Sequence, residues 1–111
     1  MTASELVMRL PDLFNPAKAR GYNRVIQLAL TGEEGGQWYL DIQNQTCTVH
    51  QGTAEKPRIT IEMSAEDFVA YFTGQVQPMT LVMGKRMKFS GPMTEGIAFN
   101  SIWRIPKAPA S

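Results

Sequence analysis

The sequence predicts an α+β domain in which the strands precede most of the helices. Between residues 24 and 63, apolar residues alternate with polar ones, which is the period of a half-buried strand. From Ser64 onward the apolar residues recur at helical spacing instead. With 111 residues, 43% of them hydrophobic, the chain has the size of one domain with its own core. We therefore treat residues 1–111 as a single domain, ordered over 1–105, with 106–111 as a loose C-terminal tail.

Two short helical segments are expected before the first strand. Apolar residues recur at helical spacing over residues 4–10, and Pro11 is expected to end this helix. A second helical turn is expected to open at Asn15-Pro16 and to end at Gly21. The sheet is therefore expected to begin after this glycine.

Four strands are expected next. Residues 24–31, 37–43 and 46–51 alternate between apolar and polar side chains and are separated by turn residues, which predicts an antiparallel meander. A fourth strand, residues 58–63, follows a loop that runs from Gly52 to Pro57. The alternation places one apolar set on the inner face of the sheet: Ile26, Leu28, Leu30, Trp38, Leu40, Ile42, Ile59, Ile61 and Met63.

The second half of the chain is expected to be mainly helical. Ser64 can cap a helix by accepting a hydrogen bond from the amide of Asp67, and Gly74 is a natural end for that helix. Pro78 is expected to begin a second short helix that runs to about Arg86. A short fifth strand, residues 87–90, follows it.

The last predicted helix, residues 94–104, is apolar on all sides rather than along one stripe. Such a helix needs two apolar partners, of which the sheet is one. The other is a ligand, a membrane surface or another protein, unless the helix is simply buried deeply. The residues around its circumference are Met93, Ile97, Ala98, Phe99, Ile102, Trp103 and Ile105.

Methionines are concentrated in the same region, with Met79, Met83, Met87 and Met93 falling close together. Unbranched, polarisable methionine side chains suit irregular apolar cavities. A methionine-rich core is the structural alternative.

Charge and signals exclude several function classes. The net charge of +1 and the absence of charge runs do not indicate a nucleic-acid-binding surface. No apolar stretch is long enough to span a bilayer, and the first residues do not resemble a secretory signal. Cys47 is alone, so no internal disulfide can form. A cytoplasmic location is therefore expected.

A search for catalytic residues finds no site, so an enzyme is not expected. Cys47 and His50 lie three apart on a predicted strand and should point to opposite faces. Glu66 and Asp67 are explained by helix capping, and no metal site or cofactor motif is expected. Gly84-Lys85-Arg86 could form a basic rim at a pocket mouth, or simply a solvated loop.

The segment from Ile59 to Pro78, ITIEMSAEDFVAYFTGQVQP, resembles the signature segment of the sterol carrier protein 2 family. The resemblance continues through residues 83–91, and GQWYLDI at residues 36–42 is similar to the second strand of that family. In all, the likeness covers about residues 22–103. Each motif is weak by itself, but their order and spacing are specific.

The resemblance implies a mixed five-stranded sheet covered on one face by helices, with an apolar tunnel between the sheet and the C-terminal helices. It also implies a carrier or presenter of a fatty-acyl or sterol-like lipid. The alternative is an accessory module that holds an isoprenoid-type intermediate or docks a protein partner through the C-terminal helix. The tunnel residues that the resemblance implies are Phe68, Phe72, Leu81, Met83, Met87, Phe89, Met93, Ile97, Phe99, Ile102 and Trp103.

Two residues depart from the family pattern. Lys85 stands where the family commonly has glycine, and Pro92 stands where it commonly has aspartate. Both lie on the path into the last helix. The resemblance therefore does not fix the local path there, nor the tunnel entrance that depends on it.

Overall fold

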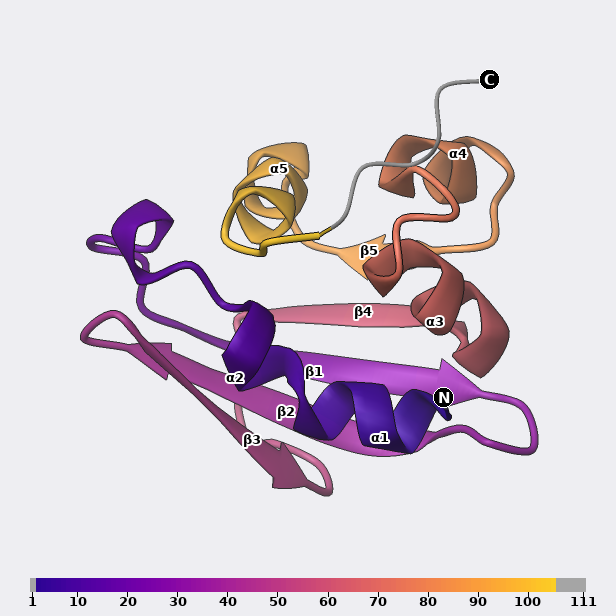
Figure 1. The fold of residues 1–111 in the computed structure, drawn as a ribbon, viewed down its shortest axis with the longest axis horizontal. Helices are drawn as coiled ribbons and strands as arrows, with labels where there is room; N and C mark the ends of the chain where they lie inside the picture. Colours follow the sequence, from indigo (N-terminus) through magenta and orange to yellow (C-terminus); the bar gives the residue numbers. More distant parts are fainter. Residues whose placement is uncertain (1, 106–111) are drawn as a thin grey trace.

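A computed structural model describes residues 2–105 of the chain (Figure 1). The proposed tail, residues 106–111, lies outside the described residues. The elements, in chain order, are α1 (Ala3–Met8), α2 (Leu10–Leu13), a 3-10 turn (Pro16–Lys18), β1 (Arg24–Thr31), β2 (Gly36–Gln43), β3 (Thr46–Gln51), β4 (Ile59–Ser64), α3 (Ala65–Phe72), α4 (Pro78–Met83), β5 (Lys88–Ser90) and α5 (Met93–Ser101).

The strands form one mixed sheet in the order β3-β2-β1-β4-β5. β1 pairs antiparallel with β2 and parallel with β4, while the β2–β3 and β4–β5 pairs are antiparallel. A parallel pair needs a crossover, and the connection from β3 to β4 supplies it. The predicted meander and the mixed five-stranded α+β fold are both confirmed.

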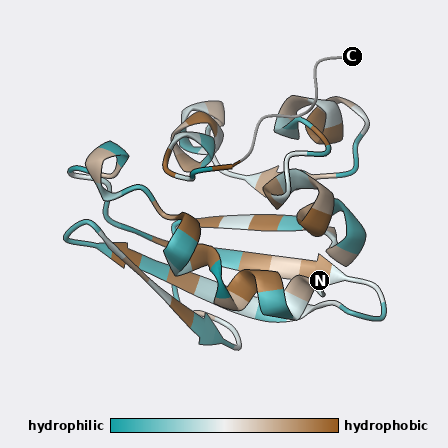
Figure 2. Ribbon diagram, viewed as in Figure 1, coloured by the Kyte–Doolittle hydropathy of each residue, from teal (hydrophilic) through white to brown (hydrophobic). Residues whose placement is uncertain are grey.

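One face of the sheet is apolar and carries the core. Figure 2 shows the apolar and polar bands that alternate along the strands. The helices α1, α2, α3 and α5 bring their own apolar residues to this face, and α1 and α2 lie over β1 and β2 in Figure 1. The sheet residues that it buries are the predicted inner set: Ile26, Leu28, Leu30, Trp38, Leu40, Ile42, Ile59, Ile61 and Met63.

The other face of the sheet holds one buried polar side chain, Gln27, beneath the β3–β4 crossover. Its amide nitrogen donates to the carbonyl oxygens of Trp38 and Gly52 at 3.1 and 3.2 Å. Its amide oxygen accepts from the backbone N–H of Ala54 at 2.7 Å. A buried amide with donor and acceptor both satisfied is stable away from water, so Gln27 fixes the crossover against the sheet.

The N-terminal helices begin and end elsewhere than the sequence predicted. α1 begins at Ala3 rather than at residue 4 and is capped by Thr2, whose hydroxyl accepts from the Glu5 amide at 3.1 Å while the Glu5 carboxylate accepts from Thr2 in return. Pro11 does not end a helix but lies in the first turn of α2. This position suits proline because a first-turn N–H has no partner within the helix.

The later helices begin as predicted, but α4 is shorter than expected. The Ser64 hydroxyl accepts from the Asp67 amide at 3.0 Å, which confirms the predicted cap of α3. α4 begins at Pro78 and ends at Met83, not near Arg86. After Gly84, Lys85 has a left-handed backbone with φ of 59°, which turns the chain toward β5.

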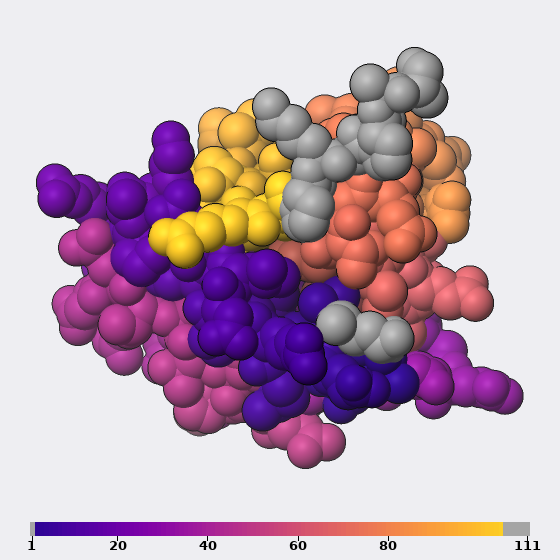
Figure 3. Space-filling view, viewed as in Figure 1, coloured from indigo at the N-terminus to yellow at the C-terminus, as the bar shows by residue number. Residues whose placement is uncertain are grey.

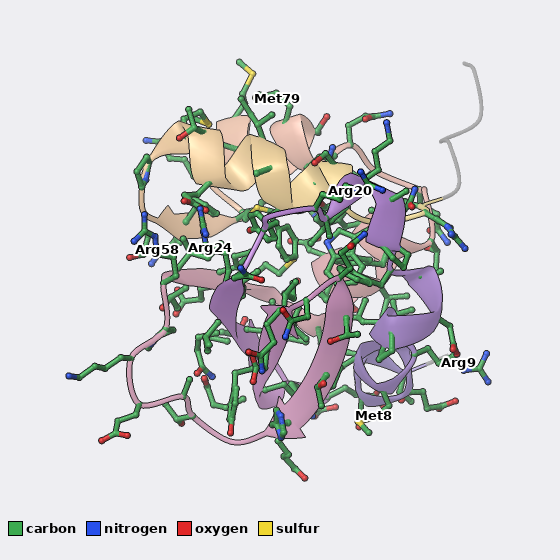
Figure 4. The ribbon with its side chains drawn as sticks, turned by 90° about the vertical axis from the view of Figure 1, so that its left-hand side faces the viewer. Met8, Arg9, Arg20, Arg24, Arg58 and Met79 are labelled. Carbon is green, nitrogen blue, oxygen red and sulfur yellow. The ribbon has the colours of Figure 1, made fainter. Side chains whose placement is uncertain are left out.

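The helix α5 is held to the sheet at its first turn by a buried carboxylate. Glu95 is only 8% exposed, and its carboxylate accepts from Nε of Arg24 on β1 at 3.1 Å. Nε of Arg58 lies 3.7 Å from the same carboxylate. Figure 4 shows Arg24 and Arg58 close together at one side of the molecule. Pro92, which precedes α5, offers no side-chain cap, so this ion pair provides the anchor at that end.

The far end of α5 is held by aromatic packing. Trp103 makes edge-to-face contacts with Phe14, Phe72 and Phe99, with ring centroids 5.5 to 5.7 Å apart. Backbone bonds support this packing, because the Asn15 N–H donates to the Ile102 carbonyl at 2.8 Å. In Figure 3 the N-terminal and C-terminal segments accordingly lie against each other.

The Glu95 anchor predicts a pH dependence of stability. The Arg24 hydrogen bond and the two guanidinium charges lower the pKa of Glu95 below its usual 4.5. A carboxyl with a lowered folded-state pKa stabilises the fold above its unfolded pKa, and this contribution disappears as the pH falls through the folded value. Urea unfolding should therefore show Glu95→Gln to be less stable than the wild type at pH 7, with the gap narrowing below about pH 4.5. An unchanged gap at pH 3 would contradict the assignment.

Candidate functional site

A cavity of about 440 Å³ opens between α4, β5 and α5. The end of α3 and the middle of β4 contribute to its inner wall. The volume lies within the range of roughly 300 to 1,000 Å³ that is usual for small-molecule sites. Its lining residues are Ile61, Tyr71, Gln77, Pro78, Met79, Val82, Met87, Phe89, Gly91, Met93, Gly96, Ile97, Phe99 and Asn100.

The floor of the cavity is formed by two paired strand residues. Ile61 on β4 lies directly opposite Phe89 on β5, and both point to the apolar face of the sheet. α5 crosses above Phe89 at Gly96, where an added Cβ would lie 3.5 Å from the Phe89 ring. A larger side chain at this position would extend into the space between the helix and the strand. The glycine therefore keeps the cavity open.

Three polar side chains belong to the cavity lining. The hydroxyl of Tyr71 donates to Oδ1 of Asn100 at 2.7 Å, and Gln77 lies on the same cavity. Burial raises the pKa of Tyr71 well above its usual 10, so the phenol stays protonated and remains a donor. No charged side chain belongs to the lining formed by residues 2–105. The site can thus hold an apolar chain and make neutral hydrogen bonds to a polar end.

The rim of the cavity exposes large apolar side chains. Met79, Met93 and Ile97 both line the cavity and remain 54%, 59% and 63% exposed. Met83, at the end of α4, is 78% exposed and does not line the cavity. Exposed apolar side chains that lie together indicate a surface that contacts a ligand, a membrane or another protein.

The turn after α4 carries Lys85 and Arg86, and an ion pair holds it to α3. The Arg86 guanidinium makes a two-pronged ion pair with the carboxylate of Asp67, whose side chain is 8% exposed. This contact ties the turn after α4 to the first turn of α3. Lys85 and Arg86 lie outside the cavity lining.

The eleven predicted tunnel residues divide into two groups in the structure. Five of them line the cavity: Met87, Phe89, Met93, Ile97 and Phe99. The other six do not line it. Met83 is exposed to solvent outside it, and the remaining five are packed in the core: Phe68, Phe72, Leu81, Ile102 and Trp103.

Sequence reasoning missed much of the lining. Ile61 was expected only as a core residue, whereas it also forms the cavity floor. The polar residues Tyr71, Gln77 and Asn100 gave no sequence signal of their own. Gly96 did give one, because a glycine inside a helix reduces helix stability and calls for a packing reason.

The side chains of Cys47 and His50 lie on opposite faces of the sheet and do not form a catalytic pair. Cys47 pairs with Ile42 and faces the core side of the sheet, whereas His50 pairs with Tyr39 on the opposite face. The His50 ring stacks on Tyr39 with centroids 4.9 Å apart. Burial and the nearby Asp41 raise the pKa of the Cys47 thiol to about 12. Among residues 2–105, no group of three histidine, cysteine or carboxylate side chains is placed to bind a metal.

Over residues 2–105, no helix reaches the length and hydropathy that a membrane-spanning helix requires.

Comparisons with known proteins agree on the family and the fold. The chain is 30% identical over 90 residues to hydroxysteroid dehydrogenase-like protein 2 of Xenopus tropicalis, a match that covers 80% of this chain and 22% of that protein. Among solved structures, palmitated SCP2L2 from Aedes aegypti gives a TM-score of 0.70 at 22% identity and covers 90% of this chain and 92% of its own. A ubiquinone synthesis protein, UbiJ-SCP2, also gives 0.70, at 13% identity, and covers 90% of each chain.

These likenesses show a common fold, and the chain spans only about a fifth of the length of its curated relatives. The family model described as the SCP-2 sterol transfer family matches residues 5–104, which include every strand and helix from β1 to α5. The chain belongs to the SCP-2 sterol transfer family.

Proposed function

We propose that this chain binds one apolar lipid molecule in the cavity between α4 and α5, and carries or presents it without a chemical step of its own. The observation that carries the proposal is the cavity of about 440 Å³, lined mainly by methionine, aromatic and aliphatic side chains. Burying hydrocarbon there releases roughly 0.8 kcal/mol for each methylene group. The methionines give the walls freedom to fit chains of different shape.

The polar wall suggests how the lipid is oriented. Tyr71, Gln77 and Asn100 supply hydrogen-bonding groups without a charge. A hydroxyl or carbonyl oxygen fits such groups directly. A carboxylate has no cation within the described lining to offset its desolvation, so it would stay at the mouth in contact with water. The hydrocarbon then extends toward Phe89 and Met93.

The names of two relatives of known structure support this proposal, because each refers to a lipid or to its synthesis. One solved relative carries palmitate, a sixteen-carbon fatty acyl group. Another is a ubiquinone synthesis protein, which keeps the alternative of an accessory module that holds an isoprenoid-tailed intermediate. Both alternatives use the same cavity, because an isoprenoid tail is also a long apolar chain, with a methyl branch on each unit. The relative affinities of fatty-acyl and isoprenoid ligands, measured by displacement of one fluorescent probe, distinguish the two alternatives.

A fluorescent fatty-acyl probe should bind with micromolar affinity. A yield of roughly 0.3 kcal/mol for each non-hydrogen atom gives about 5 to 6 kcal/mol for a sixteen-carbon acid, which sets about 0.1 mM as the weak end of the range. Gly96→Leu should abolish this binding, because its side chain fills the space above Phe89. Titration of probe fluorescence measures both.

Gly96→Ala is the matched control for that variant. Its Cβ makes only an ordinary contact with Phe89. It should therefore bind the probe and be up to about 1 kcal/mol more stable, because alanine favours the helix over glycine. Probe binding that survives in Gly96→Leu, with the fold intact, would remove this cavity as the lipid site.

Charged substitutions should separate the cavity from the core. Ile97→Asp changes an exposed rim residue and Phe89→Arg a half-buried floor residue, so both should lose probe binding while the protein still folds. Leu40→Asp places an unpaired charge at a fully buried strand position and should cost more than about 4 kcal/mol. Circular dichroism melts and probe titrations measure the two effects. If Ile97→Asp unfolds as completely as Leu40→Asp, the rim assignment is wrong.

The absence of a chemical role for the thiol can be tested separately. With a pKa of about 12, the Cys47 thiol is protonated at pH 8 and should react with an alkylating reagent at least about tenfold more slowly in the folded protein than in urea. Cys47→Ala and His50→Ala should bind the acyl probe like the wild type, since neither residue lines the cavity. Rapid alkylation of the native protein would point to an activated cysteine.

A further inference from the structure

We propose that Asn100 selects the class of lipid that the cavity accepts, which is a neutral lipid whose polar end is a carbonyl group, as in an ester. Tyr71 has a positioning role, because its hydroxyl determines which side of the Asn100 amide is left for the ligand. The inference rests on the proposed function, since it concerns the polar end of a lipid that is held in the same cavity.

The hydroxyl of Tyr71 is held in place by the core. Tyr71 lies in the last turn of α3, is only 2% exposed, and packs its ring against Phe72 with centroids 4.6 Å apart. Burial raises the pKa of the Tyr71 phenol, which therefore keeps its proton at neutral pH. The hydroxyl is thus a hydrogen-bond donor at a fixed position in the cavity lining.

This donor sets the orientation of the Asn100 amide. The Tyr71 hydroxyl donates to Oδ1 of Asn100 at 2.7 Å, so the amide oxygen is occupied. The amide nitrogen of Asn100 carries two hydrogens and donates to no acceptor within residues 2–105. Asn100 lines the cavity and is exposed, so both hydrogens remain available to a ligand.

Donors without a charge favour a neutral acceptor. A carbonyl oxygen accepts hydrogen bonds and carries no hydrogen that needs a partner of its own. A hydroxyl or ammonium group would instead bring donors toward an amide oxygen that already accepts from Tyr71. A carboxylate would lose its hydration, and no cation in the described lining offsets that cost. A neutral carbonyl is therefore the polar group that matches Asn100.

The bond between Tyr71 and Asn100 also joins α3 to α5, but this structural role does not require asparagine. An aspartate at position 100 could accept from the Tyr71 hydroxyl in the same way. Asparagine differs from aspartate in its amide NH2, the group that is left for the ligand. Exchanging these two residue types therefore separates ligand selection from helix packing.

Displacement of the fluorescent acyl probe by two ligands of equal chain length tests the inference. Methyl palmitate offers a carbonyl, and hexadecylamine offers a protonated amine. In Asn100→Asp the two donors are replaced by a negative charge, so the affinity for the ester relative to the amine should fall at least about tenfold below the wild-type ratio. Comparing ratios removes the hydration of the free ligands, because it is the same for both proteins.

Ser101→Asp is the matched control, because it adds the same charge to the next residue of α5, which does not line the cavity. It should leave the ratio within about twofold of the wild type, since an exposed charge outside the lining is screened. Tyr71→Phe frees the Asn100 amide to turn and should also shift the ratio toward the amine. Lost packing alone would weaken both ligands equally. Circular dichroism melts check that each variant folds.

Three results would overturn the inference: an unchanged ratio in Asn100→Asp, an equal change in Ser101→Asp, or equal weakening of both ligands in Tyr71→Phe. If Asn100→Asp does not fold, the Tyr71→Phe ratio decides. Each of these results leaves the proposed function in place, because the wild type still binds the acyl probe. A wild type that does not bind the probe would instead contradict the proposed function, and the inference with it.

Discussion

The site depends on how α5 is attached to the sheet. Glu95 binds Arg24 and Arg58 at one end of the helix, and Trp103 packs among aromatic rings at the other. Between these points the helix passes over Phe89 of β5 at Gly96, and Met93 and Ile97 remain more than half exposed. The cavity therefore lies beneath a helix that is fixed at both ends and passes over Phe89 between them.

The core is correspondingly divided into a closed part and an open part. Over β1 and β2 the apolar face is sealed by α1, α2 and α3, and residues such as Leu40 and Phe68 have no access to water. Over β5 the cover is incomplete, because this strand has only three residues and lies at the sheet edge. A domain of this size can keep such an opening because the aromatic cluster around Phe72 and Trp103 stabilises the covering helices.

The sequence predicted the strands well. It was less informative about which side of each helix packs in the core and which side faces the cavity or the solvent. Period-two alternation predicted all four long strands and their inner face, and Ser64 predicted the start of α3. The site was harder to predict, because apolar residues close together on one short helix have different surroundings. Leu81 is in the core, whereas Met83 is exposed. The all-apolar pattern of residues 93–105 predicted two partners for the last helix, but tertiary packing decided that Phe99 meets both core and cavity while Ile102 meets only the core. Tyr71, Gln77 and Asn100 escaped notice because polar residues carry no periodic signal.

The contact between Phe14 and Trp103 joins segments from opposite ends of the described chain. Contacts of such long sequence separation form late, because most of the chain must be ordered before the two segments meet. During synthesis on the ribosome, the four long strands and the first two helices are complete before β5 and the segments after it emerge. Until then the apolar face of the sheet is only partly covered, and the edge at β4 has no neighbour. The nascent domain thus passes through a stage in which its last thirty or so residues govern whether it closes or associates with other chains.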